Sequence, residues 1–137
     1  MELRQSHKPY HPDHSIVYSC QYHIIFCPKY CRKVLTDALA APMKELVLAK
    51  QAEYGYTVIE MEVLPDHVHL LLDVDPRAGI NVVVGKIKGF TSHELRNEFP
   101  WLKKRLPTLW TRSKFISTVG AVTLAVVQQY IESQKGV

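Results

Sequence analysis

The segment YTVIEMEVLPDHVHLLLDV, residues 56–74, decides the fold of this chain. Apolar and polar side chains alternate over residues 56–64 and β-forming residues are frequent there, which predicts a strand. Pro65 and Asp66 are typical turn residues, and the apolar run over residues 67–74 predicts a second strand. Because so short a link joins them, we expect the two strands to pair as an antiparallel hairpin.

Two histidines stand one residue apart at the start of the second strand. Alternate residues of a strand project from the same face, so we expect His67 and His69 to lie side by side on one face of the sheet. Val68, Leu70 and Leu72 would then point to the opposite face, into the core. Two parallel imidazoles supply half of a metal site, although such a pair on a strand is about as often structural.

The remaining segments alternate between strand-like and helix-like patterns. In chain order they predict a strand over residues 16–27, a helix over 37–54, a helix from Ile80 that ends at Pro100, a strand over 109–119 and a helix over 124–135. Thr36 and Gly55 are expected to cap the first helix, and Thr123 and Gly136 the last. The first six elements, β-α-β-β-α-β, match the split βαβ plan of ferredoxin-like and RRM-like α+β folds. That plan places two helices on one face of an antiparallel sheet, so the two histidines would lie on its open face.

Length and composition favour one ordinary domain. A chain of 137 residues is long enough for one core. No apolar run approaches the roughly 18 residues of a membrane span, so we expect no membrane partner. The N-terminus lacks the apolar core of a signal peptide, and residues 1–14 are expected to form a loose arm. An odd number of cysteines, three, fits free thiols in the cytoplasm, with a metal pair of Cys27 and Cys31 as a remote alternative.

Positive charge is concentrated in two blocks of the sequence. Residues 1–33 hold five basic and two acidic residues, and residues 86–114 hold eight and two, within a formal net charge of +4. Residues 34–85 carry the opposite excess. This distribution fits a solvated surface and a nucleic-acid-binding surface built from two segments about equally well.

The predicted last helix carries two further polar residues of interest. Tyr130 and Gln134 are four positions apart, so they lie on the same face of that helix. Taken alone, such a tyrosine is more often a half-buried packing residue, and such a glutamine a surface residue.

Two motifs together resemble a known family. Pro65-Asp66-His67-Val68-His69-Leu70-Leu71 resembles the HUH motif, and Tyr130-Ile131-x-x-Gln134 resembles the catalytic tyrosine and third metal ligand of the single-tyrosine HUH transposases (TnpA) of IS200/IS605-type insertion sequences. Segments 22–30, 86–92 and 117–120 also resemble family segments in the family order, so the resemblance spans nearly the whole chain. Two positions depart from the family pattern. Cys31 stands where an arginine is expected in a basic loop, and Lys114-Phe115 replaces a tyrosine-phenylalanine pair.

The resemblance implies a metal-dependent transposase that acts on single-stranded DNA. His67, His69 and Gln134 would hold a divalent ion, Mg²⁺ or Mn²⁺, which polarises the scissile phosphate. Tyr130 would attack that phosphate, giving a 5′-phosphotyrosine and a free 3′-OH. The strands would then be rejoined during excision and insertion of the element.

The resemblance also implies the partners of a single HUH transposase domain over residues 1–137. These are single-stranded DNA with hairpin ends and a second copy of the chain, in a prokaryotic cytoplasm and at the nucleoid during activity. The mobile tyrosine helix, residues 121–137, would complete the active site of the other subunit, with Gly120 as hinge. The candidate DNA-binding residues are Lys29, Tyr30, Arg32, Lys33, Lys86, Lys88, Arg96, Lys103, Lys104, Arg105, Arg112 and Lys114.

Other classes of protein stay open at this stage. A non-catalytic ferredoxin-like nucleic-acid-binding protein would function without the Tyr130 hydroxyl. A metal hydrolase using Asp66, His67 and His69 with an activated water would cleave without a covalent adduct. A relative that no longer transposes would carry the same motifs. Tyr30, Phe90 and Trp110 could stack on unpaired bases, with core packing as the alternative.

Overall fold

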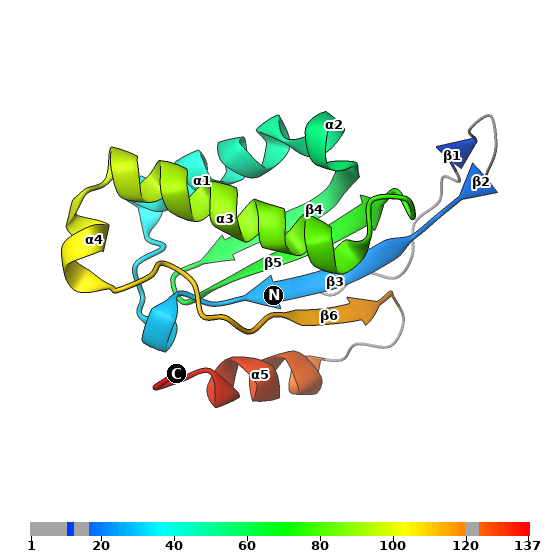
Figure 1. The fold of residues 1–137 in the computed structure, drawn as a ribbon. Coiled ribbons are helices and arrows are strands. Elements are labelled where there is room, and N and C mark those ends of the chain that lie inside the picture. The colour runs from blue at the N-terminus through cyan, green and yellow to red at the C-terminus, as the bar shows by residue number, and fades with distance from the viewer. Residues whose placement is uncertain (1–10, 13–16, 120–123) are drawn as a thin grey trace.

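The protein is described by a computed structural model, which covers residues 11–12, 17–119 and 124–137. Its centre is a four-stranded antiparallel sheet in the order β4-β5-β3-β6. These strands are β3 (Gln21–Phe26), β4 (Tyr56–Leu64), β5 (His67–Val74) and β6 (Phe115–Thr118). Helices α1 (Asp37–Ala49) and α3 (Ile80–Glu98) cover one face of the sheet, and α5 (Leu124–Ser133) lies on the other side (Figure 1). The predicted split βαβ plan is confirmed, with α5 added to it.

Five shorter elements complete the described chain. They are β1 (His11–Pro12), β2 (Val17–Tyr18), the 3-10 turn η1 (Lys29–Cys31), α2 (Gln51–Tyr54) and α4 (Trp101–Arg105). β1 pairs with β2, and the rest of the predicted N-terminal arm lies outside the described residues. None of the described helices is long and apolar enough to cross a membrane.

The hairpin of β4 and β5 forms as predicted. Leu64 pairs with His67 across the two-residue turn, and a bulge after Val58 shifts the register further along. Val68, Leu70 and Leu72 belong to the main apolar core. The histidines therefore project from the opposite face, as the period of two requires.

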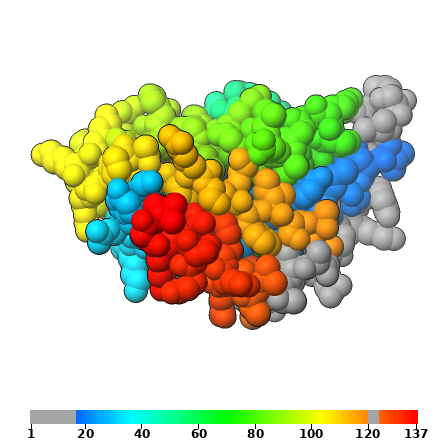
Figure 2. All heavy atoms as spheres, turned by 60° about the horizontal axis from the view of Figure 1, so that its bottom comes forward, coloured from blue at the N-terminus to red at the C-terminus, as the bar shows by residue number. Residues whose placement is uncertain are grey.

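That opposite face is not open, which corrects the expectation from sequence. Every residue of β5 is buried, and His67 and His69 are 8% and 2% exposed. Figure 2 shows α5 at the front, over this side of the molecule. Its Val127 is fully buried, so α5 contributes an apolar residue to a second, smaller packing layer.

The first predicted strand and helix are each divided in two. The strand expected over residues 16–27 splits into β2 and β3, which belong to different sheets. The helix expected over residues 37–54 stops at Ala49, and α2 then ends at Gly55 in the left-handed conformation expected of a C-cap. The side-chain amide of Gln51 explains this break. Its Nε2 donates to the Leu48 carbonyl, and its Oε1 accepts from the backbone amide of Val58 in β4.

The strand predicted over residues 109–119 is shorter than expected. Only β6 is regular, and residues 103–105 of the predicted basic connector belong to α4. Ile25 pairs with Phe115, and Pro28 pairs with Trp110. Between these two pairs, residues 111–114 of one segment lie opposite only residues 26 and 27 of the other. The extra residues form a bulge, which we call the 111–114 bulge. Pairing resumes beyond the bulge, where the Thr111 amide donates to the Cys27 carbonyl and the Lys29 amide donates to the Leu109 carbonyl.

The termini of the last helix were predicted in part. α5 begins at Leu124 as expected and ends at Ser133, two residues earlier than predicted, with Gly136 in the left-handed region. The proposed cap Thr123 and hinge Gly120 lie outside the described residues. α3 ends at Glu98, just before Pro100, as its sequence indicates.

Candidate active site

His67 has the environment of a metal-ligating histidine. It opens β5 directly after the turn residue Asp66, whose Oδ1 lies 2.8 Å from Nδ1 of His67. This carboxylate assigns the proton of the neutral ring to Nδ1 and leaves the lone pair on Nε2. Nε2 is buried and has no hydrogen-bond partner among the described residues. A buried acceptor of this kind is costly unless something binds it.

His69 is held by a third histidine, His23 on β3. Nε2 of His69 and Nδ1 of His23 lie 3.0 Å apart, and the two rings stack with centroids 5.1 Å apart. Burial, with smaller effects from His23 and His67, lowers the pKa of His69 to about 4. His69 is therefore neutral at pH 7, the form that can bind a metal. Sequence reasoning missed His23, although its place in the adjoining predicted strand was a usable indication.

Tyr130 and Gln134 reach this side of the sheet from α5. The Tyr130 hydroxyl donates to Ser113 Oγ at 3.2 Å, and its ring lies 5.6 Å from the ring of Phe115. Gln134 is 7% exposed, and its buried Oε1 has no hydrogen-bond partner within the described part of the chain. The structure thus brings the predicted nucleophile and third ligand to the face that carries His67 and His69.

The loop after β3 anchors the other end of this helix. The Cys31 thiol donates to the Ile131 carbonyl at 3.6 Å, and the Tyr30 amide donates to the Val137 carbonyl at 3.0 Å. Tyr30 and Cys31 both have positive φ, an unusual conformation for these residue types. The three cysteines are free, as predicted, and burial raises the pKa of Cys27 and of Cys31.

The phenol of Tyr130 is not activated by its surroundings alone. Burial raises its pKa to about 12, and the hydrogen bond to Ser113 opposes this rise. The phenol is therefore protonated at pH 7, and an approaching substrate or ion has to assist loss of the proton.

Lys88 supports the position of Ser113. From α3 its Nζ donates to the carbonyls of Thr111 and Ser113 at 2.6 and 2.9 Å, so it satisfies both within the 111–114 bulge. Burial and, less strongly, Lys114 lower the pKa of Lys88 to about 8. A chain of contacts thus leads from α3 through the bulge to the Tyr130 hydroxyl.

The donor set fits a divalent ion at His67 and Gln134 and requires one change at His69. Nε2 of His67 and Oε1 of Gln134 are buried acceptors without a partner among the described residues. To bind through Nε2, His69 has to give up its contact with His23. The described residues contain no group of three or more His, Cys, Asp or Glu that could hold a metal, so the remote cysteine site receives no support.

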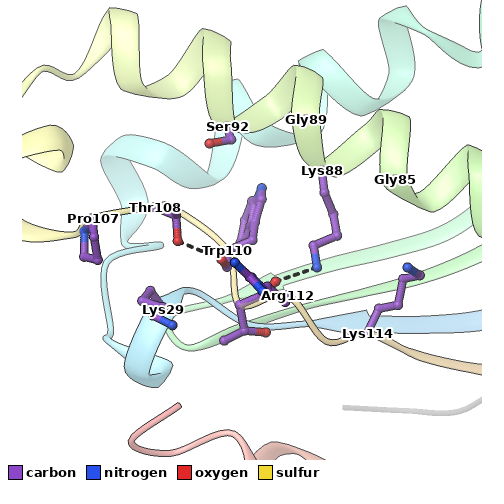
Figure 3. A pocket seen from close by; sticks show the side chains of 11 residues that line it. Lys29, Gly85, Lys88, Gly89, Ser92, Pro107, Thr108, Trp110, Arg112 and Lys114 are labelled. Carbon is purple, nitrogen blue, oxygen red and sulfur yellow. Dashed lines mark hydrogen bonds between the residues drawn. The ribbon is translucent and has the colours of Figure 1, made fainter.

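Four of the twelve predicted DNA-binding residues line one hollow beside α3. The twelve lie on η1 and just after it (Lys29, Tyr30, Arg32, Lys33), on α3 (Lys86, Lys88, Arg96), on α4 (Lys103, Lys104, Arg105) and in the bulge (Arg112, Lys114). The side chains of Lys29, Lys88, Arg112 and Lys114 line the same pocket (Figure 3). Lys88 differs from the others, because its ammonium group binds two backbone carbonyls.

The three aromatic residues considered for base stacking differ in exposure. Tyr30 is 41% exposed, with the Lys29 ammonium group 5.2 Å from its ring centroid. Trp110 is buried, packs edge-on against Phe26 and donates from Nε1 to Thr91. Phe90 packs against Tyr54 of α2. Of these three residues, Tyr30 alone is exposed in the described structure.

Fold and site together define a class of protein: a ferredoxin-like α+β domain with a buried His-x-His pair on a central strand and a tyrosine helix docked over it. The sequence matches the family described as IS200-like transposases over residues 16–134. It is 42% identical over 120 residues to the ISDra2 transposase TnpA of Deinococcus radiodurans, with 86% of each chain covered. It is 33% identical over 120 residues to the transposase for insertion sequence element IS200 of Salmonella typhimurium, covering 85% of this chain and 78% of that one.

Solved structures agree with these sequence matches. A protein of Deinococcus radiodurans R1, solved as a candidate transposase, superimposes with a TM-score of 0.86 at 34% identity, covering 93% of this chain and 99% of that one. A REP-associated tyrosine transposase bound to a REP hairpin shares the fold, with a TM-score of 0.57 at 10% identity over 95% of this chain and 69% of that one. The chain belongs to the IS200-like transposase family, whose members are DNA-processing enzymes.

Proposed function

We propose that this transposase cuts and rejoins single-stranded DNA through a covalent link to Tyr130. The observation that carries the proposal is a pair of buried acceptors without partners among the described residues, Nε2 of His67 and Oε1 of Gln134, beside the nucleophile's helix. Neither atom is explained by the packing of the described chain. Both are explained by a shared divalent ion at a site for phosphate chemistry.

His67, His69 and Gln134 would hold Mg²⁺ or Mn²⁺, of which Mn²⁺ accepts imidazole more readily. Such an ion, when bound, polarises the scissile phosphate and offsets the charge that develops on it. Asp66 orients His67 through Nδ1, which leaves Nε2 of that ring for the ion. His23 instead contacts Nε2 of His69, so this contact would have to open for the ion to bind there.

The residues of the chain then perform one exchange at phosphorus. The Tyr130 oxygen forms a bond to phosphorus as its phenolic proton departs, and the bond from phosphorus to the 3′ oxygen breaks. The released 3′ oxygen takes up a proton, so a 5′-phosphotyrosine and a 3′-OH result. Attack by a 3′-OH reverses these steps and reseals a strand without ATP, because the phosphotyrosine is still an ester. Ser113 holds the phenol in place until substrate arrives.

An adduct assay tests this proposal. The protein is incubated with Mn²⁺ or Mg²⁺ and a labelled single strand that carries the end of the element, and denaturing gels are searched for a protein–DNA adduct. We expect Tyr130→Phe and His67→Ala to abolish the adduct and Tyr54→Phe, a tyrosine on α2, to retain it. Cleavage without an adduct would favour a metal hydrolase, and binding without cleavage would favour a nucleic-acid-binding protein.

We also propose that two copies of the chain exchange α5, within the cytoplasm of a prokaryotic cell. In the single chain the helix packs on its own subunit through Ser113 and Cys31. Mixed dimers test the exchange. Tyr130→Phe and His67→Ala copies, each inactive alone, would regain adduct formation on mixing if each site takes its tyrosine from the partner. If dimers that are shown to contain one copy of each variant form no adduct, each chain uses its own tyrosine.

A further inference from the structure

Two glycines lie in the interior of α3, where glycine is a poor helix former. Gly85 and Gly89 are four residues apart and so share one face of the helix. A Cβ placed on either would meet no atom within 4 Å among the described neighbours. Neither glycine has a positive φ, so neither backbone conformation requires glycine. Packing within the described protein therefore explains neither residue.

Both glycines line a hollow of about 490 Å³ between α3 and residues 107–114. Figure 3 shows the glycine face of α3 on one side of it and the segment with Thr108, Trp110 and Arg112 on the other. A second hollow of about 470 Å³ shares Gly89, Ser92, Pro107 and Thr108 with the first and continues to Asn97. We call the two together the α3 groove. From residue 85 to residue 97 it follows the helix for about 18 Å, the length of about five stacked nucleotides.

The groove is lined by cations and by no carboxylate. Lys29, Lys88, Arg112 and Lys114 line the first hollow, and Arg96 and Lys103 line the second together with the imidazole of His93. No aspartate or glutamate lines either one among the described residues. Lys29, Arg112 and Lys114 form no ion pair with a described carboxylate, so their charges are available to an anionic ligand. The chemistry of this lining fits a chain of phosphates.

The groove adjoins the catalytic tyrosine through one segment. Thr111, Arg112 and Lys114 of the bulge line the groove, and Ser113 of the same bulge accepts the Tyr130 hydrogen bond. A strand in the groove is therefore held next to the residue that positions the nucleophile.

We propose that the α3 groove binds unpaired nucleotides of the DNA strand that flanks the scissile phosphate. The proposal rests on the proposed function, from which it takes single-stranded DNA as substrate. Phosphates lie against Arg112, Lys114 and Lys29, and sugars or bases pack on the bare helix surface at Gly85 and Gly89. The glycines are present because a side chain there would occupy the space of the nucleotide. A duplex is too bulky to enter hollows of this size.

The test fills the groove without disturbing the protein. Gly89→Ala and Gly89→Leu are compared with Ala41→Leu, which enlarges an exposed residue on α1, all in a Tyr130→Phe background that cannot cleave. Binding of a fluorescein-labelled oligodeoxythymidine is measured by anisotropy. We expect Gly89→Leu to weaken binding about tenfold and Gly89→Ala to weaken it less, since loss of contact with one base has effects of this size. Ala41→Leu should bind like the parent, and the Tm of Gly89→Ala should not fall, because alanine is the better helix former.

A second pair of variants tests the charges. Arg112→Gln and Lys114→Gln should each weaken binding and reduce the slope of log affinity against log salt by about one. If Gly89→Leu binds the single strand as tightly as the parent, or loses as much affinity for duplex DNA as for the single strand, the α3 groove is not the binding site proposed. Because the readout is binding without cleavage, it is independent of the adduct assay. If the binding results support the α3 groove but no protein–DNA adduct forms, only the tyrosine mechanism is refuted.

Discussion

Lys88 connects α3 to the bulge that holds Ser113, and its burial gives the stability of the protein a specific dependence on pH. Its pKa falls from 10.5 to about 8, chiefly because burial disfavours the charged form. Because Lys88 is only partly buried, solvent screening reduces the free energy that this drop represents, to about 2 kcal/mol when the lysine is protonated in both states. The hydrogen bonds to the carbonyls of Thr111 and Ser113 favour the charged form, so they act against this shift.

The sign of the pH dependence follows from the direction of the shift. Below about pH 8 the lysine is protonated in the folded and the unfolded chain, so the full cost of burial applies. Between about pH 8 and 10.5 the unfolded chain keeps a proton that the folded chain has released, and stability rises with pH. Above that range both forms are neutral and the cost is absent.

The perturbation is Lys88→Met, which removes the titrating group and keeps an apolar stem of similar length. Between pH 7.5 and pH 10 we expect the free energy of unfolding of the parent to increase relative to the variant by about 2 kcal/mol. Urea unfolding followed by tryptophan fluorescence at the two pH values measures this difference. Titrating groups that do not interact with Lys88 cancel in the comparison.

The control is Lys44→Met, which alters an exposed lysine on α1. It should give the same difference from the parent at both pH values. If the stability curves of parent and Lys88→Met run parallel between pH 7.5 and pH 10, Lys88 is not buried with a lowered pKa, and its role as the support of Ser113 fails with it.

Changes at four further positions have definite expected outcomes. Ser113→Ala removes the acceptor of the Tyr130 hydrogen bond that lowers the phenol pKa, so adduct formation should slow about tenfold, as for loss of one positioning contact, and its pH–rate profile should move to higher pH. Gln134→Leu should weaken Mn²⁺ binding measured by calorimetry, whereas Gln134→Glu should retain it, and equal affinity in the leucine variant would remove Gln134 from the ligand set. Gly55→Ala should lower stability by about 1–2 kcal/mol in thermal unfolding, because its φ is 80° and an added Cβ would lie 3.1 Å from the Cβ of Ala78. Tyr56→Phe should cost about 1 kcal/mol in urea unfolding, since it leaves the buried Val47 carbonyl without its donor, and no change would refute that bond.

The position of the nucleophile has a consequence for how the enzyme is controlled. The Tyr130 phenol is protonated at neutral pH and bound to Ser113, so the folded chain alone does not hold an activated nucleophile. Under the proposed mechanism, activation depends on entry of the ion and the DNA, which would confine the reaction to assembled complexes. The contact between His69 and His23 acts in the same direction, because it has to open before Nε2 of His69 can bind an ion.

Local sequence patterns determined the parts of the protein that depend on near neighbours. The hairpin of residues 56–74, the face on which His67 and His69 lie, the cap at Gly55 and the spacing of Tyr130 and Gln134 all follow from the period of an element or from the chemistry of a turn. These features are set within a few residues of chain, so tertiary contacts did not alter them.

Only the tertiary structure decided how distant segments complete the site. The His23–His69 contact joins residues 46 apart, Lys88 reaches carbonyls 23 and 25 residues away, and Tyr130 meets Ser113 across 17 residues. The 111–114 bulge lies between the Ile25–Phe115 and Pro28–Trp110 pairs of two segments far apart in the chain, and α5 covers a face that the strand pattern alone leaves open. Such contacts depend on which buried polar groups find partners when the core closes, and no periodicity in the sequence records that outcome.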